Sequence, residues 1–242
     1  MPEEKKVGII GGTFDPIHCG HLNIARLMGE KFALERIIFM PALAPPHKDN
    51  EEISAFSHRY AMVERAIEPE KTFCISALEA QRQGRSYTID TLRQLRTLHP
   101  HASLYFLMGM DSFAQLDSWK EYNRLFEYSN IVVAQRPGTP TYARREDLPV
   151  ALRHLFCYDA ARNSFTYAGN AKKPVAPSSP DHGNLYFLRG ACMDISSTEI
   201  RHRVQHNQPL DGMVPAAVQE YIARHGLYKN LTTSRQVRGK IS

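Results

Sequence analysis

Two histidines follow a glycine-rich turn near the start of the chain. The run G-G-T-F-D-P-I-H-C-G-H occupies positions 11–21, directly after a short apolar stretch and directly before a segment with helical spacing. Backbone N–H groups at the start of a helix lack intrahelical partners, and the helix dipole favours negative charge there. His18 and His21, three residues apart, share one face of that first turn. The pattern predicts a phosphate site and the chemistry of phosphoryl or nucleotidyl transfer.

Other kinds of site fit this run less well. The dinucleotide fingerprint G-x-G-x-x-G is absent, and no Gly-Lys-Ser/Thr follows as it would in a P-loop. A His-x-x-His pair could bind zinc, but no general-base Glu or third ligand stands at a recognised spacing. Glycine turns and single histidines are often purely structural. The combination after a strand favours a phosphate over both alternatives.

Two further segments carry cations suited to phosphate. The run I-S-S-T-E-I-R at positions 195–201 offers small hydroxyls at a helix start and, one turn in, the guanidinium of Arg201. Taken by itself, this run would indicate a capped helix with a solvated arginine. Together with the run at positions 11–21, it predicts a second phosphate-binding segment. Lys48 ends a proline-rich loop at residues 41–48 that would hold it at a fixed point. Loop lysines are usually solvent charges, so this contact depends on the other motifs.

Three other positions suggest an acceptor site. The run S-Y-T-I-D-T-L at positions 86–92 starts a helix that Thr88 or Asp90 could cap, and amides there could bind a carboxylate. Asp111 follows Gly109, and a carboxylate at a strand end commonly accepts ribose hydroxyls. Trp119, the one tryptophan, is either a core residue or a stacking face for an aromatic ring.

Composition predicts a soluble enzyme of the cytoplasm. The 242 residues are 43% hydrophobic and 23% charged, as in a globular protein with a full core. Four scattered cysteines without a C-x-x-C pair favour a reduced compartment, and we find no signal core or membrane-length apolar run. A net charge of +5 suits polyanionic small molecules. No basic stripe with interleaved aromatics indicates a nucleic-acid partner, and homo-oligomerisation stays open.

Strand-length apolar runs alternate with helical patterns. We expect strands at residues 7–10, 36–40, 72–76, 104–108, 130–134 and 185–188, and helices at 19–32, 55–67, 88–98 and 118–127. This order predicts a Rossmann-like, doubly wound α/β fold: a mostly parallel sheet with helices on both faces and a C-terminal helical segment, at about 196–206 and 214–225. Ligands in such folds bind beyond the carboxyl ends of the strands, where the motifs fall.

One domain accounts for most of the chain. We expect a single nucleotidyltransferase domain at residues 1–228, with a polar, proline-rich surface insertion at about 139–184 that is partly mobile. Residues 229–242 are basic and lack periodicity, which predicts a flexible tail.

The motifs together resemble those of bacterial nicotinate-nucleotide adenylyltransferases in the HxGH nucleotidyltransferase superfamily. The matches are G-G-x-F-D-P-x-H-x-G-H (11–21), P-P-H-K (45–48), S-Y-T-x-D-T (86–91), G-x-D (109–111) with Trp119 downstream, R-P-G (136–138), I-S-S-T-x-I-R (195–201) and V-P-x-x-V-x-x-Y-I-x-x-x-G-L-Y (214–228). The chain departs from the family around residues 155–184 and after residue 228, away from every motif.

The resemblance implies adenylyl transfer from ATP to nicotinate mononucleotide, giving nicotinate adenine dinucleotide and diphosphate in NAD biosynthesis. Mg²⁺ is expected as a cofactor carried by the ATP phosphates, without a protein metal site. Catalytic roles fall on His18, His21, Lys48 and Arg201. ATP contacts are expected from Gly11, Gly12, Thr13, Phe14, His18, His21, Gly109, Asp111, Arg136, Ile195, Ser197, Thr198 and Arg201. Mononucleotide contacts are expected from Asp15, Lys48, Thr88, Ile89, Asp90, Trp119 and Lys120.

Three alternatives remain at this point. A nicotinamide-mononucleotide adenylyltransferase would differ in its pyridine pocket, where residues 86–91 and Trp119 favour the acid. A pantetheine-phosphate adenylyltransferase would share the phosphate motifs but need another acceptor pocket. A non-catalytic nucleotide-binding regulator would have lost phosphate ligands, whereas His18, His21, Lys48 and Arg201 are all present.

Overall fold

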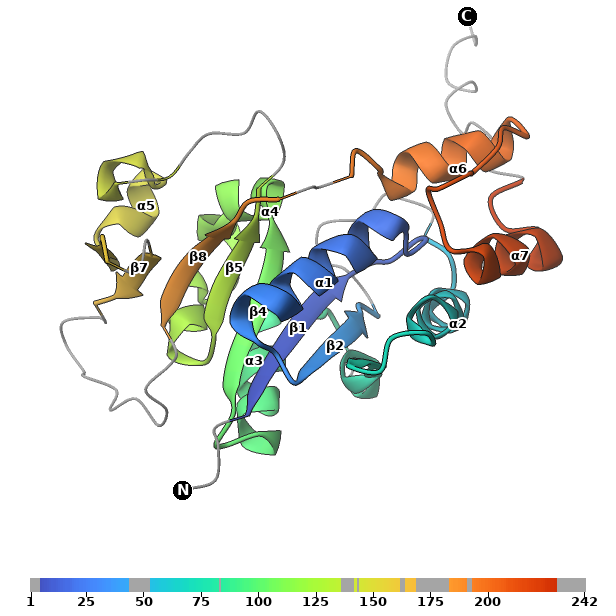
Figure 1. Cartoon of the computed structure of the whole chain (residues 1–242). Coiled ribbons are helices and arrows are strands. Elements are labelled where there is room, and N and C mark those ends of the chain that lie inside the picture. Colours follow the sequence, from blue (N-terminus) through green and yellow to red (C-terminus); the bar gives the residue numbers. More distant parts are fainter. Residues whose placement is uncertain are drawn as a thin grey trace, which may run out of the picture.

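A computed structural model of the chain describes residues 5–43, 53–82, 84–135, 142, 144–161, 164–168, 183–190 and 193–229. Within these ranges, eight strands form one sheet in the order β3-β2-β1-β4-β5-β8-β7-β6 (Figure 1). The strands are β1 Lys6–Gly12, β2 Arg36–Pro41, β3 Phe73–Ile75, β4 Ser103–Gly109, β5 Asn130–Ala134, β6 Phe156–Asp159, β7 Ser164–Tyr167 and β8 Asn184–Leu188.

The sheet is parallel except at one edge. Strands β1 to β5 and β8 pair in parallel, while β7 pairs antiparallel with both β6 and β8. The chain starts at β1 in the middle of the sheet, moves outward to β2 and β3, and then crosses back to β4 on the other side of β1. The end of β1 is therefore the topological switch point, where ligands bind in this class of fold.

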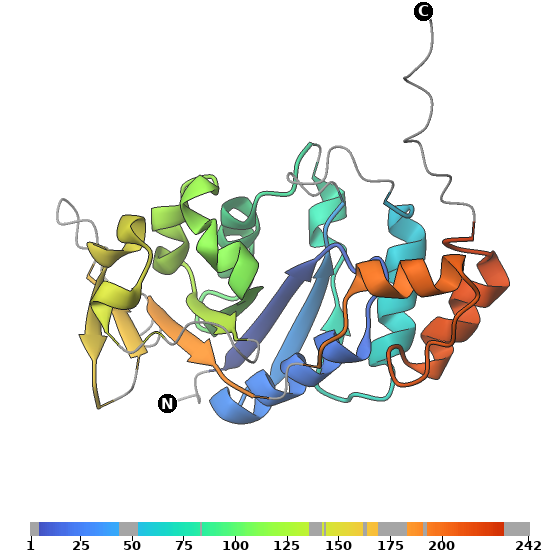
Figure 2. The same cartoon turned by 90° about the horizontal axis from the view of Figure 1, so that it is seen from above.

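Helices cover both faces of the sheet. The α-helices are α1 Cys19–Phe32, α2 Phe56–Ile67, α3 Thr88–Leu98, α4 Met110–Ala114, α5 Val150–Arg153, α6 Ser197–Gln205 and α7 Ala216–His225, and 3-10 helices form at Leu78–Gln81, Leu116–Ser118, Tyr122–Glu127 and Arg145–Asp147. Helices α1, α2 and α7 pack with Ile10 of β1 on one face, whereas α3 and α4 pack with Ile9 on the other. Figure 2 shows α1 below the sheet and the green helices above it.

The expected fold class is confirmed. All six predicted strands form, and β1 to β5 have the order of a Rossmann-like sheet. Helix α6 begins after the N-cap Ser196, whose Oγ accepts a hydrogen bond from the Glu199 N–H, and α7 ends at Gly226 in the left-handed conformation. None of the helices in the described part of the chain is long and apolar enough to cross a membrane.

Two local predictions were wrong. The helical pattern over 118–127 does not form one α-helix, because Glu121 has a φ of +48° and separates two 3-10 helices there. Neither Thr88 nor Asp90 caps α3: the N-cap residue is Tyr87, with no capping hydrogen bond from its side chain. Side-chain spacing alone did not reveal either backbone conformation.

The predicted surface insertion contributes to the core where it is described. Strands β6 and β7 extend the sheet at its β8 edge, and Phe156 and Phe165 are 1% exposed. Their rings pack in one aromatic cluster with Phe126 and Tyr167. Residues 139–141, 143, 162–163 and 169–182 of the predicted insertion lie outside the described residues, and so do residues 230–242 of the predicted tail.

Candidate active site

The two histidines face each other at the start of α1. His18 is the N-cap residue of α1 and His21 stands in its first turn. Their rings stack with centroids 3.6 Å apart and 25° between the planes. The His18 N–H donates a hydrogen bond of 3.3 Å to Nδ1 of His21. A nitrogen that accepts carries no proton, so this bond assigns Nδ1 of His21 as the acceptor and Nε2 as the N–H donor.

Buried charges hold the loop that precedes α1. Asp15 is 3% exposed, and its Oδ1 accepts from the Tyr228 hydroxyl at 2.7 Å while Oδ2 accepts from the Ser54 N–H at 3.1 Å. Arg59, 1% exposed, donates from Nη1 to the Thr13 carbonyl at 2.7 Å and from Nε to the Ser54 carbonyl at 2.9 Å. The loop is therefore fixed by the protein before any ligand arrives, as electrostatic catalysis requires.

The start of α6 packs on the same loop. The Ser197 hydroxyl donates to the Pro16 carbonyl at 2.9 Å, and Nη1 of Arg201 donates to the Asp15 carbonyl at 2.8 Å. Nη2 of Arg201 also lies 3.3 Å from the Thr198 hydroxyl. These bonds bring the N-terminus of α6 beside that of α1, although 176 residues separate His21 from Ser197 (197 − 21). Two helix N-termini and a guanidinium then converge on one region, which suits a polyphosphate.

Two cavities flank the end of β1. The first, here called the histidine cavity, has a volume of about 330 Å³, and its lining includes both stacked rings together with Gly11, Gly20, Gly109, Met193, Ile195 and Ser197. The second, here called the tryptophan cavity, has a volume of about 310 Å³, and its lining includes Gly11, Gly12, Thr13, Glu79, Ser86, Tyr87, Thr88, Trp119 and Lys120. Gly11 lines both cavities. Groups bound in the two cavities could therefore meet at this residue.

The tryptophan cavity lies between α3 and the segment that carries Trp119. The first turn of α3 leaves the amides of Thr88 and Ile89 without intrahelical acceptors. Glu79, 8% exposed, lines the cavity, and its Oε1 accepts a 2.7 Å hydrogen bond from the Thr91 hydroxyl. Burial raises the pKa of Glu79, against the lowering effect of that hydrogen bond. An aromatic face and helix-start amides can hold a flat ring that bears an anion.

Most of the predicted contacts line one cavity or the other. Of the expected ATP contacts, Gly11, His18, His21, Gly109, Ile195 and Ser197 line the histidine cavity, while Gly12 and Thr13 line the tryptophan cavity. Of the expected mononucleotide contacts, Thr88, Trp119 and Lys120 line the tryptophan cavity. The structure brings these residues to one edge of the sheet from five separate stretches of sequence.

The remaining predicted contacts line neither cavity. Phe14 and Ile89 are buried, Asp111 is exposed in the first turn of α4, and Thr198 and Arg201 lie beside the histidine cavity on α6. The Asp15 carboxylate is bonded within the protein, and Asp90 accepts a 2.8 Å hydrogen bond from Nζ of Lys120. Lys48 and Arg136 lie outside the described residues.

Sequence reasoning missed three residues that hold the site. Arg59, Ser54 and Tyr228 fix the loop that precedes α1 through the contacts given above. Tyr228 ends the last recognised motif, which was the available signal for a role. No motif near Arg59 in the sequence predicts its role, because an arginine inside an amphipathic helix normally extends its charged group into solvent.

The donor set of the histidine cavity does not match a resident Mg²⁺ cage. Mg²⁺ prefers oxygen ligands in octahedral geometry, whereas imidazoles, amides and hydroxyls surround this cavity. Among the residues that the structure describes, no group of three or more His, Cys, Asp or Glu could hold a metal ion. Mg²⁺ does fit the site in another form, bound to substrate phosphates and water.

Comparison with known proteins agrees with this geometry. The cytidylyltransferase-like family matches residues 9–203. Probable nicotinate-nucleotide adenylyltransferases of Syntrophotalea carbinolica and Geobacter sp. (strain M21) are each 40% identical to the chain, over 93% and 92% of its length and 98% of theirs. Nicotinic acid mononucleotide adenylyltransferase of Plasmodium falciparum, complexed with NaAD, has the same fold with a TM-score of 0.67 at 18% identity, covering 93% of this chain and 98% of that one.

Fold and site together define a nucleotidyltransferase of the cytidylyltransferase-like class. The stacked histidines at the switch point and the two cavities that meet there are the structural basis of that assignment. Since relatives at 40% identity match nearly the whole chain, the chain belongs to the nicotinate-nucleotide adenylyltransferase family.

Proposed function

We propose that this chain transfers the adenylyl group of ATP to nicotinate mononucleotide, releasing diphosphate and forming nicotinate adenine dinucleotide for NAD biosynthesis. The observation that carries the proposal is the meeting of two cavities at Gly11, one lined by His18 and His21 and the other by Trp119. ATP occupies the histidine cavity and the mononucleotide occupies the tryptophan cavity. The α-phosphate of ATP then lies near Gly11, where an in-line attack is possible.

The chemistry needs no general base. The attacking atom is an ionised phosphate oxygen of the mononucleotide, which forms a bond to the α-phosphorus while the bond to the β-phosphate oxygen breaks. The protein contributes position and charge stabilisation. Nε2 of His21, the donor nitrogen assigned by the His18 contact, stabilises the charge that develops on the α-phosphate.

The outer phosphates of ATP lie toward α6. The amides of its first turn, the Thr198 hydroxyl and the Arg201 guanidinium form the phosphate-binding segment, with Lys48 and Arg136 as further cations. Gly109 allows the adenosine to approach β4, and Asp111 accepts the ribose hydroxyls. Mg²⁺, bound to the phosphate oxygens and water, neutralises part of the charge on the departing diphosphate.

The acceptor is selected by charge as well as shape. Trp119 stacks on the pyridine ring, while the amides of Thr88, Ile89 and Lys120 bind the nicotinate carboxylate. Nicotinamide lacks that charge, so it gains less from helix-start amides. Its mononucleotide should therefore react less efficiently.

The proposal is tested by measuring diphosphate release from ATP and Mg²⁺ with nicotinate or nicotinamide mononucleotide at equal concentration. We expect release with both ATP and nicotinate mononucleotide present, and a higher kcat/KM for nicotinate than for nicotinamide mononucleotide. Equal efficiency with the two would overturn the proposed selectivity. Absence of release with either would overturn the activity.

A further inference from the structure

An ion-pair network joins the two walls of the tryptophan cavity. Arg93, in the second turn of α3, donates from Nη2 to Oε2 of Glu121 at 2.5 Å and from Nη1 to Oε1 at 3.2 Å. Glu121 directly follows Trp119 and Lys120 in the chain. A two-point guanidinium–carboxylate pair fixes orientation as well as distance. It therefore connects the helix that presents the Thr88 amide to the segment that presents the indole ring.

The backbone at Glu121 needs such support. Its φ of +48° lies in the left-handed region, which is unfavourable for a residue with a side chain. This conformation separates the two 3-10 helices and turns the chain just after Lys120. Arg124 reinforces the contact, because its Nη1 donates to Oε2 of Glu121 at 2.8 Å. The carboxylate of Glu121 thus anchors a strained turn to two cations.

A second contact runs across the same gap. Nζ of Lys120 donates to Oδ2 of Asp90 at 2.8 Å and lies 4.9 Å from the centre of the Tyr87 ring. Asp90 in turn lies 3.4 Å from Nη1 of Arg93. Asp90 therefore lies between the cations of Arg93 and Lys120, and each charge is stabilised by neighbours of opposite sign.

We propose that Arg93 and Glu121 are positioning residues for the mononucleotide, which set the separation between the α3 amides and the Trp119–Lys120 segment and thereby the selectivity for a pyridine carboxylate. This inference rests on the proposed function. The pair acts through its neighbours and does not line the cavity. An anion gains most from helix-start amides when it is held close to them, so the separation between α3 and the Trp119–Lys120 segment affects how tightly the mononucleotide binds.

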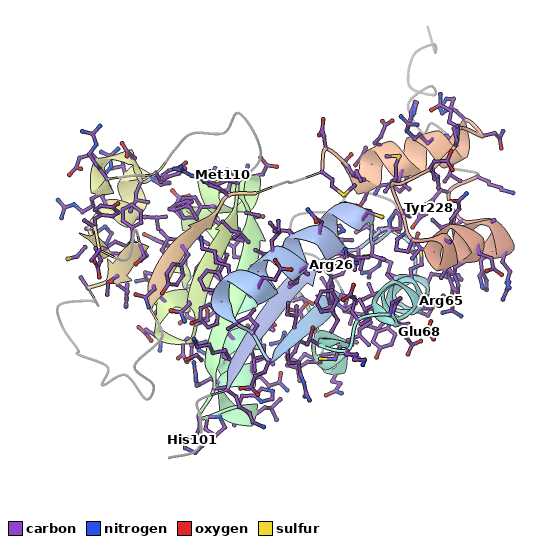
Figure 3. All side chains as sticks on the ribbon, viewed as in Figure 1. Arg26, Arg65, Glu68, His101, Met110 and Tyr228 are labelled. Atoms are coloured by element: carbon purple, nitrogen blue, oxygen red, sulfur yellow. The ribbon has the colours of Figure 1, made fainter. Side chains whose placement is uncertain are left out.

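Stability alone would not explain the pair. The side chains of Arg93 and Glu121 are 31% and 34% exposed, and exposed ion pairs contribute little to folding. The Arg26–Glu70 pair, with an N–O distance of 2.7 Å and side chains 47% and 26% exposed, offers a matched control on α1, where Figure 3 labels Arg26. Arg26 lines neither cavity.

The test compares Arg93→Ala and Glu121→Gln with Arg26→Ala. Steady-state kinetics give the KM of each substrate, and fluorescence of Trp119, the single tryptophan, reports mononucleotide binding directly. We expect the KM and Kd for nicotinate mononucleotide to rise on the order of tenfold in both single variants, with the KM for ATP and kcat changed by less than about twofold. The preference for nicotinate over nicotinamide mononucleotide should fall in both single variants.

Three results would overturn the inference. One is an unchanged KM and Kd for nicotinate mononucleotide in both single variants while the wild-type enzyme is active. Another is a rise in the KM of ATP that equals the rise in the KM of nicotinate mononucleotide in both single variants. A loss of thermal midpoint well beyond that of Arg26→Ala in both single variants would also count against the inference, because either result would indicate a general structural role. A wild-type chain that neither releases diphosphate nor changes its fluorescence with nicotinate mononucleotide would instead overturn the proposed function, and this inference with it.

Discussion

The Tyr228 hydroxyl donates a 2.7 Å hydrogen bond to Oδ1 of Asp15, although 213 positions separate them in the sequence. Asp15 lies in the loop that precedes α1, and its Oδ2 accepts from the Ser54 N–H. The last described turn of the chain is thereby tied to the loop that precedes His18. Figure 3 shows Tyr228 on the side of the molecule where α6 and α7 meet the start of α1.

Removing this hydroxyl should weaken the fold and loosen the ATP site. Tyr228→Phe leaves the buried Asp15 carboxylate with one fewer donor, and a hydrogen bond to a charged group contributes about 1.5–3 kcal/mol. We expect that loss in the free energy of unfolding by urea, together with a raised KM for ATP. Tyr221→Phe is the control, because the Tyr221 hydroxyl pairs with His58 on α2, away from the loop. It should lower stability without changing the KM for ATP, and an equal change in both variants would contradict the role of Asp15.

The same bond predicts a pH dependence. Burial, and then the neighbouring Asp15 charge, raise the pKa of Tyr228 above its usual value. A raised pKa in the folded state means that the stabilisation is complete below the unfolded value of about 10 and is lost as the pH rises through the folded value. The stability difference between the wild type and Tyr228→Phe should therefore be constant from pH 6 to about pH 9 and shrink only in stronger alkali. Urea unfolding at a series of pH values measures it, and a difference that already falls near neutrality would argue against the bond.

Substitutions at Gly109 and Gly8 should distinguish a glycine that contacts the ligand from one that is needed for packing. An added Cβ at Gly109 meets no atom of the described residues within 4 Å, so Gly109→Ala should leave stability unchanged or raised by about 0.5 kcal/mol. If ATP occupies the histidine cavity, its KM should nevertheless rise. At Gly8 the Cβ would lie 2.7 Å from side-chain carbons of Leu34 and Met28, so Gly8→Ala should cost about 1–3 kcal/mol. Thermal unfolding and ATP kinetics on both variants distinguish the cases, and an ATP KM unaffected by Gly109→Ala would place the nucleotide elsewhere.

Glu79 gives a prediction with a definite sign. Burial raises its pKa above the ordinary value. The folded state therefore favours the protonated acid, and the associated stabilisation is lost as the pH rises from about 4 through the folded pKa. Glu79→Gln does not titrate and keeps an oxygen that can accept from Thr91. Its stability relative to the wild type should increase from pH 4 to pH 7 in urea unfolding. A decrease would show that Arg82, whose Nη2 lies 3.8 Å from Oε1 of Glu79, holds Glu79 ionised.

The sequence predicted those parts of the site that depend on local chemistry. The helix starts at His18 and Ser196 could be inferred because the residues that cap them lie within one turn. The turn at Glu121 could not, since helical spacing over 118–127 says nothing about a positive φ that a distant Arg93 supports. Contacts such as Arg59 to the Thr13 carbonyl depend on packing between elements far apart in sequence. The motifs were therefore enough to predict the residues that could carry the chemistry, whereas the residues that position them could be identified only from the fold.

His21 should act through one nitrogen. Its Nδ1 accepts from the His18 N–H at the start of α1, and in the proposed function its Nε2 donates to the α-phosphate of ATP. His21→Asn keeps an oxygen that can accept from the His18 N–H but removes the donor at the position of Nε2. His21→Ala removes both the acceptor and the donor. We expect kcat to fall about 10²-fold or more in each variant, as for other groups that stabilise a transition-state charge, with a larger loss of thermal midpoint in His21→Ala. The control is His206→Ala. His206 is the C-cap residue of α6, its ring stacks on that of His202 with centroids 4.2 Å apart, and neither residue lines a cavity. Stopped assays of diphosphate release measure kcat, and near-wild-type turnover in His21→Asn would show that the histidine positions the helix and leaves the charge on the phosphate to other groups.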